Sequence, residues 1–226
     1  MAPQNAAVGL SFTETMKGFL QKGAAPAAQQ KGATPVTQDE IAAYVSAERA
    51  GQQANTYMEF TLTIAMPNLD QFLADAEHPG IANGTVRIDG FTGPAGVPVS
   101  DGLFNLFVET GRTYDRRMLY ALPFVGADGQ PYLLDGFKEV RDDGRFDVWG
   151  ATSTLYTVIR AGHDRTGPVM ACGILHILVA DFMQQLGTFT VSGTDDPARK
   201  AAALAQFGHM FMGTLWDVFA RPRLSP

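Results

Sequence analysis

The 226-residue chain has a single cysteine, Cys172, and only 17 Lys and Arg residues against 23 Asp and Glu residues. One cysteine cannot close an internal disulfide, so a disulfide framework is excluded. The net charge of −6 and the short, interrupted basic clusters disfavour a nucleic-acid-binding surface, which needs clustered basic side chains. Cys172 lies in an apolar run, and we interpret it as a buried structural thiol rather than a nucleophile.

The sequence also lacks the motifs that carry cofactor and metal chemistry. No GxGxxG, GxxxxGK[ST] or GxSxG pattern is present, and the four histidines are too scattered to form a metal site. We therefore expect no flavin, nicotinamide or metal cofactor. No apolar run approaches the roughly 20 residues of a membrane span, and the N-terminus has no signal-peptide pattern. These absences predict a cytoplasmic protein with no membrane span and no nucleic-acid partner.

Hydrophobic residues make up 46% of the chain, with 15 Phe among them, and many alternate with polar residues. A period of two predicts half-buried antiparallel strands. We expect such strands at 58–66, 84–89, 102–109, 117–124, 131–140, 146–149, 154–160, 169–179 and 188–192. This regular spacing predicts a mainly β protein, a closed, calycin-like antiparallel barrel of about nine strands.

Three regions follow from the composition. Residues 1–20 are an N-terminal segment that joins the barrel, and residues 21–37, rich in Ala, Gln, Gly and Pro, are expected to be a flexible loop. Residues 38–226 form the barrel domain with its peripheral helices, which we place at 37–51 and 68–76. Leu204, Phe207, Phe211, Leu215 and Val218 recur at helical spacing, which predicts a C-terminal amphipathic helix.

One charged residue stands on an apolar strand face. Lys138 has the same strand parity as Leu134 and Val140, so it lies inside the barrel if that face is inward. A buried ammonium needs a carboxylate or carbonyl partner, and Asp135 and Asp147 are candidates. Lys138 is then either one half of a structural ion pair or a cavity lysine that binds or polarises a ligand carbonyl.

Other strand residues combine an apolar body with a polar tip, and they are alternatives to a plain core. Besides Lys138, the catalytic candidates are His176 and Tyr120, although a histidine between Ile174 and Leu178 is also typical of a satisfied core. The expected ligand-binding set is Phe60, Phe104, Tyr120, Phe124, Tyr132, Lys138, Trp149, Tyr156 and His176.

Several segments have a familiar pattern: SFTETMKGFL, FTLTIAMPNLDQFL, MLYALPF, YLLDGFKEVRDD, DVWGATSTLYTVI, GILHILVADFMQQLGTFTVSG and FGHMFMGTLWDVF. From Ser11 to Phe219, the chain resembles the non-flavin, β-rich segment of bacterial cholesterol-oxidase-like (glucose–methanol–choline) multidomain oxidoreductases. The resemblance implies an association with sterol-like substrates and with an oxidoreductase partner. Because the flavin domain is absent here, the resemblance does not transfer oxidoreductase activity.

Three functions are consistent with these patterns. An aromatic-lined barrel could bind a hydrophobic small molecule that is sterol-, terpenoid- or polyketide-like. The same barrel could act as a cofactor-independent isomerase or cyclase on such a ligand, with acid–base help from a lysine, tyrosine or histidine. A solid core would instead indicate a structural or assembly domain, and a homo-oligomer is open in each case.

Overall fold

The computed structural model describes residues 6–26, 38–112, 114–141, 148–177 and 187–219. The elements are β1 (Gly9–Lys22), α1 (Gln38–Ala54), β2 (Tyr57–Met66), α2 (Leu69–Ala74), β3 (Pro79–Ile88), β4 (Val97–Glu109), β5 (Arg116–Val125), β6 (Pro131–Val140), α3 (Val148–Ser153), β7 (Thr154–Ala161), β8 (Val169–His176), β9 (Thr190–Ser192) and α5 (Pro197–Phe219). The predicted mainly β architecture is confirmed.

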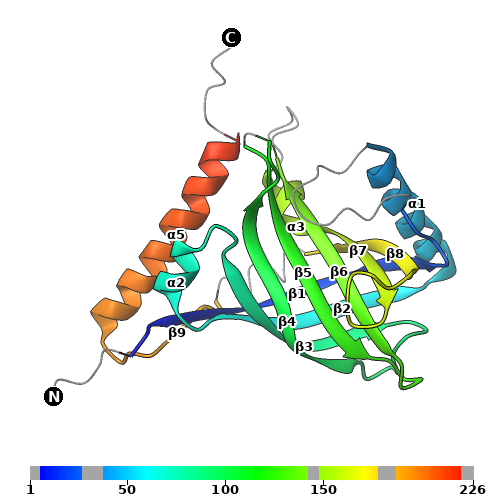
Figure 1. Ribbon diagram of the computed structural model, residues 1–226, viewed down its shortest axis with the longest axis horizontal. Coiled ribbons are helices and arrows are strands. Elements are labelled where there is room, and N and C mark those ends of the chain that lie inside the picture. Colours follow the sequence, from blue (N-terminus) through cyan, green and yellow to red (C-terminus); the bar gives the residue numbers. More distant parts are fainter. Residues whose placement is uncertain (1–5, 27–37, 113, 142–147, 178–186, 220–226) are drawn as a thin grey trace, which may run out of the picture.

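The strands form a closed antiparallel barrel (Figure 1). Strands β1 to β8 pair in sequence order, and β1 closes the barrel by pairing with both β2 and β8. Strand β9 is an extra strand that pairs with the first residues of β1, Gly9 to Ser11. Because every strand of the barrel has two partners, the sheet has no open edge between β1 and β8.

Most of the expected strands are present, although β3 and β4 begin earlier than expected, at Pro79 and Val97. Residues 9–22 form the longest strand rather than only a joining segment, and Gln21 and Lys22 belong to this strand and not to the expected loop. The last two residues of the strand expected at 146–149 are not in a strand, because Val148–Ser153 is a short helix. Residues 27–37, 142–147 and 178–186 lie outside the described residues, so the loop prediction and the ends of two strands stay untested there.

Alternating side chains of the strands fill the barrel interior. On β2, Met58, Phe60, Leu62, Ile64 and Met66 face inward, and none is more than 1% exposed. The same alternation continues around the barrel into β5 and β6. Side chains of one parity on each strand therefore build the main core, as the period of two predicted.

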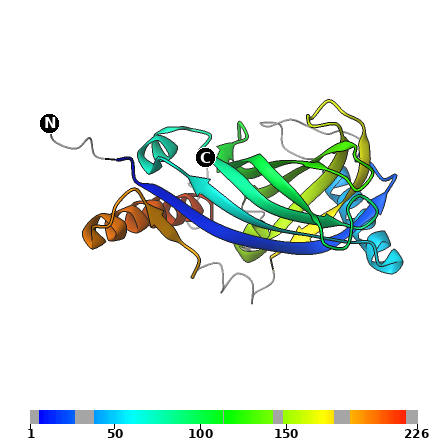
Figure 2. The same ribbon diagram turned by 90° about the horizontal axis from the view of Figure 1, so that it is seen from below.

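Helices cover two opposite sides of the barrel (Figures 1 and 2). Helix α1 packs on the outer face, where Tyr44 and Ala47 contact Val158, Cys172 and Ile174. The backbones lie so close that a Cβ at Gly51 would collide with the carbonyl oxygen of Leu20. Cysteine 172 is therefore a buried free thiol, as expected.

Helix α5 covers the other side, near α2 and the start of β1. Phe207 of α5 lies 6.3 Å from Phe72 and 6.5 Å from Phe12, measured between ring centroids. Leu215 and Val218 are also buried, whereas Leu204, which the helical pattern placed among the apolar repeats, is 42% exposed. No helix within the described residues is long and apolar enough to cross a membrane.

Candidate functional site

Three polar side chains meet inside the barrel, among otherwise apolar neighbours. Glu14 comes from β1, Tyr120 from β5 and Lys138 from β6, and each is 1% to 2% exposed. Strands β5 and β6 are neighbours, whereas β1 lies across the barrel from both. The closure of the sheet therefore brings Glu14 to the other two, and we call these three residues the interior triad.

The interior triad is held together by short contacts. Lys138 Nζ lies 2.5 Å from Glu14 Oε1, and the Tyr120 hydroxyl donates a hydrogen bond of 2.8 Å to Glu14 Oε2. Lys138 Nζ also lies 5.3 Å from the centroid of the Tyr120 ring, within range of a cation–π interaction. One carboxylate thus accepts from an ammonium and from a phenol, with one oxygen for each donor.

Burial changes the acid–base behaviour of the tyrosine. Desolvation in the interior, together with the negative charge of Glu14 and its hydrogen bond, raises the pKa of Tyr120 well above its ordinary value. The phenol therefore stays protonated across the physiological pH range and acts as a hydrogen-bond donor. A phenol that keeps its proton can stabilise negative charge that develops on a bound oxygen.

The ammonium of Lys138 has more hydrogen-bond donors than it has acceptors among the described residues. An ammonium carries three N–H groups, and within the described part of the chain Glu14 is the only hydrogen-bond acceptor of Lys138. Buried donors normally find acceptors, because an unsatisfied buried polar group costs free energy. The remaining donors could be satisfied by an oxygen atom of a ligand.

Aromatic rings pack against the tyrosine of the triad. The Tyr120 ring lies 5.1 Å from Phe104 in an edge-to-face arrangement and 6.0 Å from Phe60, between ring centroids. Phe12 extends this wall, 6.3 Å from Phe104. The structure thus brings together four residues of the expected ligand-binding set: Phe60, Phe104, Tyr120 and Lys138.

Phe124 and Tyr132 form a separate group near the turn between β5 and β6. Their rings stack at 5.6 Å, and Phe91 packs edge-on against Tyr132 at 5.2 Å. The Tyr132 hydroxyl donates to Asp128 Oδ2 at 2.8 Å. The ring contacts of these residues are with one another rather than with the triad.

The interpretation of Tyr156 and His176 as interior groups is wrong. Both lie on the outer face under α1, where Tyr156 packs 5.5 Å from the ring of Tyr44 and His176 Nε2 lies 2.8 Å from Glu48 Oε1. Helix α1 covers the apolar residues beside them, and the outer face therefore has the apolar sequence pattern of a core. The Trp149 side chain lies outside the described residues.

Of the two expected partners of Lys138, Asp135 is wrong. Asp135 has the opposite parity and pairs on the outer face with Arg160, at 3.4 Å, and Arg165, at 2.9 Å. Asp147 lies outside the described residues. The partner is Glu14, which shares strand parity with Phe12 and Met16, so a carboxylate on an apolar face was the signal in the sequence.

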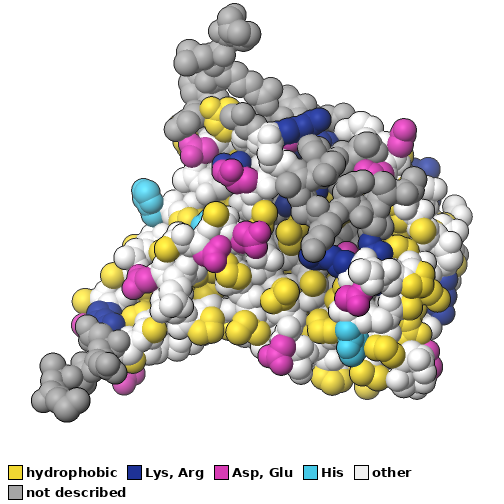
Figure 3. Space-filling model, viewed as in Figure 1, with side chains coloured by type: hydrophobic (Ala, Val, Ile, Leu, Met, Phe, Trp, Pro, Cys, Tyr) yellow, Lys and Arg dark blue, Asp and Glu magenta, His cyan; other side chains and the backbone are white. Residues whose placement is uncertain are grey.

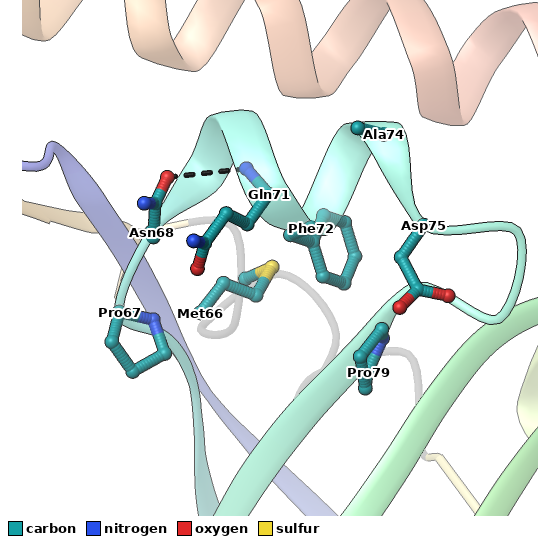
Figure 4. Close-up of a pocket in the computed structure, with 8 residues that line it drawn as sticks. All are labelled: Met66, Pro67, Asn68, Gln71, Phe72, Ala74, Asp75 and Pro79. Atoms are coloured by element: carbon teal, nitrogen blue, oxygen red, sulfur yellow. Dashed lines mark hydrogen bonds between the residues drawn. The ribbon is translucent and has the colours of Figure 1, made fainter.

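A shallow depression of about 560 Å³ lies beside α2, separate from the triad (Figure 4). Its lining comprises Met66, Pro67, Asn68, Gln71, Phe72, Ala74, Asp75 and Pro79. The Asn68 side chain caps α2 by accepting from the Gln71 backbone N–H at 3.1 Å. The Asn68 side chain therefore serves local structure, and we regard the depression as a weaker candidate site than the triad.

The described residues contain no group of three His, Cys, Asp or Glu side chains that could hold a metal ion. In comparisons with known proteins, no protein-family model, curated protein or solved structure matches the chain. The resemblance to the oxidoreductase segment therefore stays a prediction.

Proposed function

We propose that the barrel binds a hydrophobic small molecule that carries an oxygen atom, and that this oxygen accepts a hydrogen bond from Lys138. The observation that carries the proposal is the fully buried ammonium, 1% exposed, whose only acceptor within the described residues is Glu14. A carbonyl or hydroxyl oxygen would supply a further acceptor, which the described residues do not. The apolar body of the ligand would lie against Phe60 and Phe104.

The rest of the interior suits a ligand of this kind. Four inward-facing methionines, which are unbranched and adaptable, offer side chains that can repack around a guest molecule. They are Met16, Met58, Met66 and Met118. Sterol-, terpenoid- and polyketide-like molecules combine a large apolar body with few oxygen atoms, which matches one polar centre in an aromatic interior.

A matched pair of ligands tests the proposal. A polycyclic ketone and the hydrocarbon of the same skeleton are compared by thermal shift on the wild-type protein. At a hundredfold excess over Kd, the ketone should add about 2.7 kcal/mol of stability. The double variant Lys138→Met with Glu14→Leu should lose this preference, whereas His176→Gln, on the outer face, should keep it. Equal shifts for both ligands, or no shift for any, would contradict the proposal.

A second candidate function, that of a cofactor-independent isomerase or cyclase, rests on the contact of Glu14 with two donors. With a β,γ-unsaturated ketone bound, the Glu14 carboxylate could take a proton from the carbon between the carbonyl and the double bond. The C–H electron pair would then move into an enolate, whose oxygen is stabilised by Lys138 or Tyr120. Return of the proton to another carbon shifts a double bond without any oxidant.

Deuterium exchange separates catalysis from binding. In D₂O, the wild-type protein should speed deuterium incorporation next to the carbonyl of a bound ketone, followed by NMR. Glu14→Gln should abolish this exchange while leaving the thermal shift in place. Binding without any exchange would leave the first function standing and remove the second.

A further inference from the structure

Helix α5 carries an exposed face with the spacing of a coiled-coil seam. The seam consists of Ala198, Ala202, Ala205, His209, Met212 and Trp216, all exposed. The intervals alternate between four and three residues, which is the heptad pattern of apolar positions. Met212 and Trp216 are 63% and 65% exposed, more than any other large hydrophobic side chain in the described part of the chain.

The opposite face of α5 already packs on the protein. Ala203, Phe207 and Val218 are buried against the barrel side, so the seam points away from the core. Figure 1 shows α5 along one flank of the molecule, and Figure 3 shows hydrophobic side chains along the same flank. An exposed apolar seam of this kind marks an interaction surface.

We propose that the seam pairs with the same seam of a second copy, with the two helices antiparallel. About a two-fold axis, Trp216 then lies opposite the partner's Ala198, and Met212 opposite the partner's Ala202. In the third layer, His209 lies opposite the partner's Ala205. Each large side chain meets an alanine, so all the layers can pack at one helix separation.

A parallel pair in register lacks this complementarity. It would place Trp216 against the partner's Trp216 and Ala202 against the partner's Ala202, which forces the helices apart at one end and leaves a gap at the other.

The size of the seam sets the strength of the association. From residue 198 to residue 216, it spans about 27 Å of helix. A single helix pair of this length belongs to the small, transient class of interface, so we expect a dimer with Kd in the micromolar range. Association should therefore depend on protein concentration.

Sedimentation velocity over a concentration series tests the dimer. Met212→Glu, which puts a charge in the seam, should weaken association at least tenfold. Leu103→Glu is the matched control, because Leu103 is 57% exposed on β4 and far from α5 in sequence. A wild-type protein that stays monomeric throughout the series, or an equal effect of the two variants, overturns the proposal.

Disulfide trapping tests the orientation. The double variant Ala202→Cys with Met212→Cys should form a covalent dimer under oxidising conditions, because the two positions meet only across the antiparallel pair. Within one helix, they are about 15 Å apart and cannot bridge. Ala202→Cys alone should stay uncrosslinked, and the native Cys172 is buried. A crosslink in the single variant overturns the antiparallel register.

Discussion

The interior ion pair provides a quantitative test of the barrel core. Among the described residues, Lys138→Met leaves the Glu14 carboxylate with the Tyr120 hydroxyl as its one side-chain donor. The side chains of Lys138 and Glu14 are 2% and 3% exposed. Removing one partner of a buried pair typically costs about 3–5 kcal/mol, because the other charge stays desolvated. Glu14→Leu should cost a similar amount, since it strands the ammonium.

The double variant should recover most of this loss. Replacing both charges by apolar side chains of similar volume is often neutral, or stabilising by about 1–4 kcal/mol. In the double variant, the Tyr120 hydroxyl has lost its acceptor. Adding Tyr120→Phe should therefore raise the free energy of unfolding by a further amount on the order of 1 kcal/mol. The wild type, the two single variants and the double variant form a double-mutant cycle. The coupling free energy between Lys138 and Glu14 in this cycle should therefore be at least about 3 kcal/mol.

Urea unfolding, followed by fluorescence and by circular dichroism, measures each corner of the cycle. A domain of this kind has a total stability of about 5–15 kcal/mol, so the single variants should still fold at low denaturant. His176→Gln is the control on the outer face, where the side chain is partly exposed. If Lys138→Met alone changed the free energy of unfolding by less than about 0.5 kcal/mol, the claim that the pair is desolvated would be refuted.

Three further predictions concern other parts of the molecule. Burial, then hydrogen bonding to Glu59, raises the pKa of Tyr57 to about 12, and the pKa of Tyr120 is raised as well. The unfolded tyrosines ionise near pH 10 and the folded ones only above it, so stability should fall as the pH rises past 10. The urea midpoint should drop from pH 9 to pH 11, and less steeply in Tyr57→Phe. Desolvation raises the pKa of Cys172 to about 11, so an aromatic disulfide reagent at pH 8 should label it only on unfolding, and rapid labelling of the native protein would contradict this burial. Gly51→Val should destabilise the protein by about 1–3 kcal/mol through the clash with Leu20, whereas Gly213→Ala, with open space around it, should not; equal effects in thermal unfolding would argue against the close packing of α1.

The sequence alone predicted the mainly β architecture. Along strands such as Tyr57–Met66, one side of a closed sheet is dry and the other meets water, so the period of two can be read directly from the residue types. The same reading fails at 146–149, where a short segment gives too few periods to separate a strand from the helix at Val148–Ser153. The strand at Gly9–Lys22 was missed because Glu14 interrupts its apolar alternation.

The site needed the tertiary structure. Parity placed Lys138 on an apolar face, but its partner Glu14 is 124 residues away, and only closure of the barrel brings the two strands into reach. Parity also cannot say which apolar face points inward. Strands β7 and β8 are apolar on both faces, because α1 buries the outer one, and Tyr156 and His176 therefore read as interior residues. The local residue pattern indicates that a strand face is buried. Whether the barrel interior or a helix covers that face depends on contacts between segments far apart in the chain.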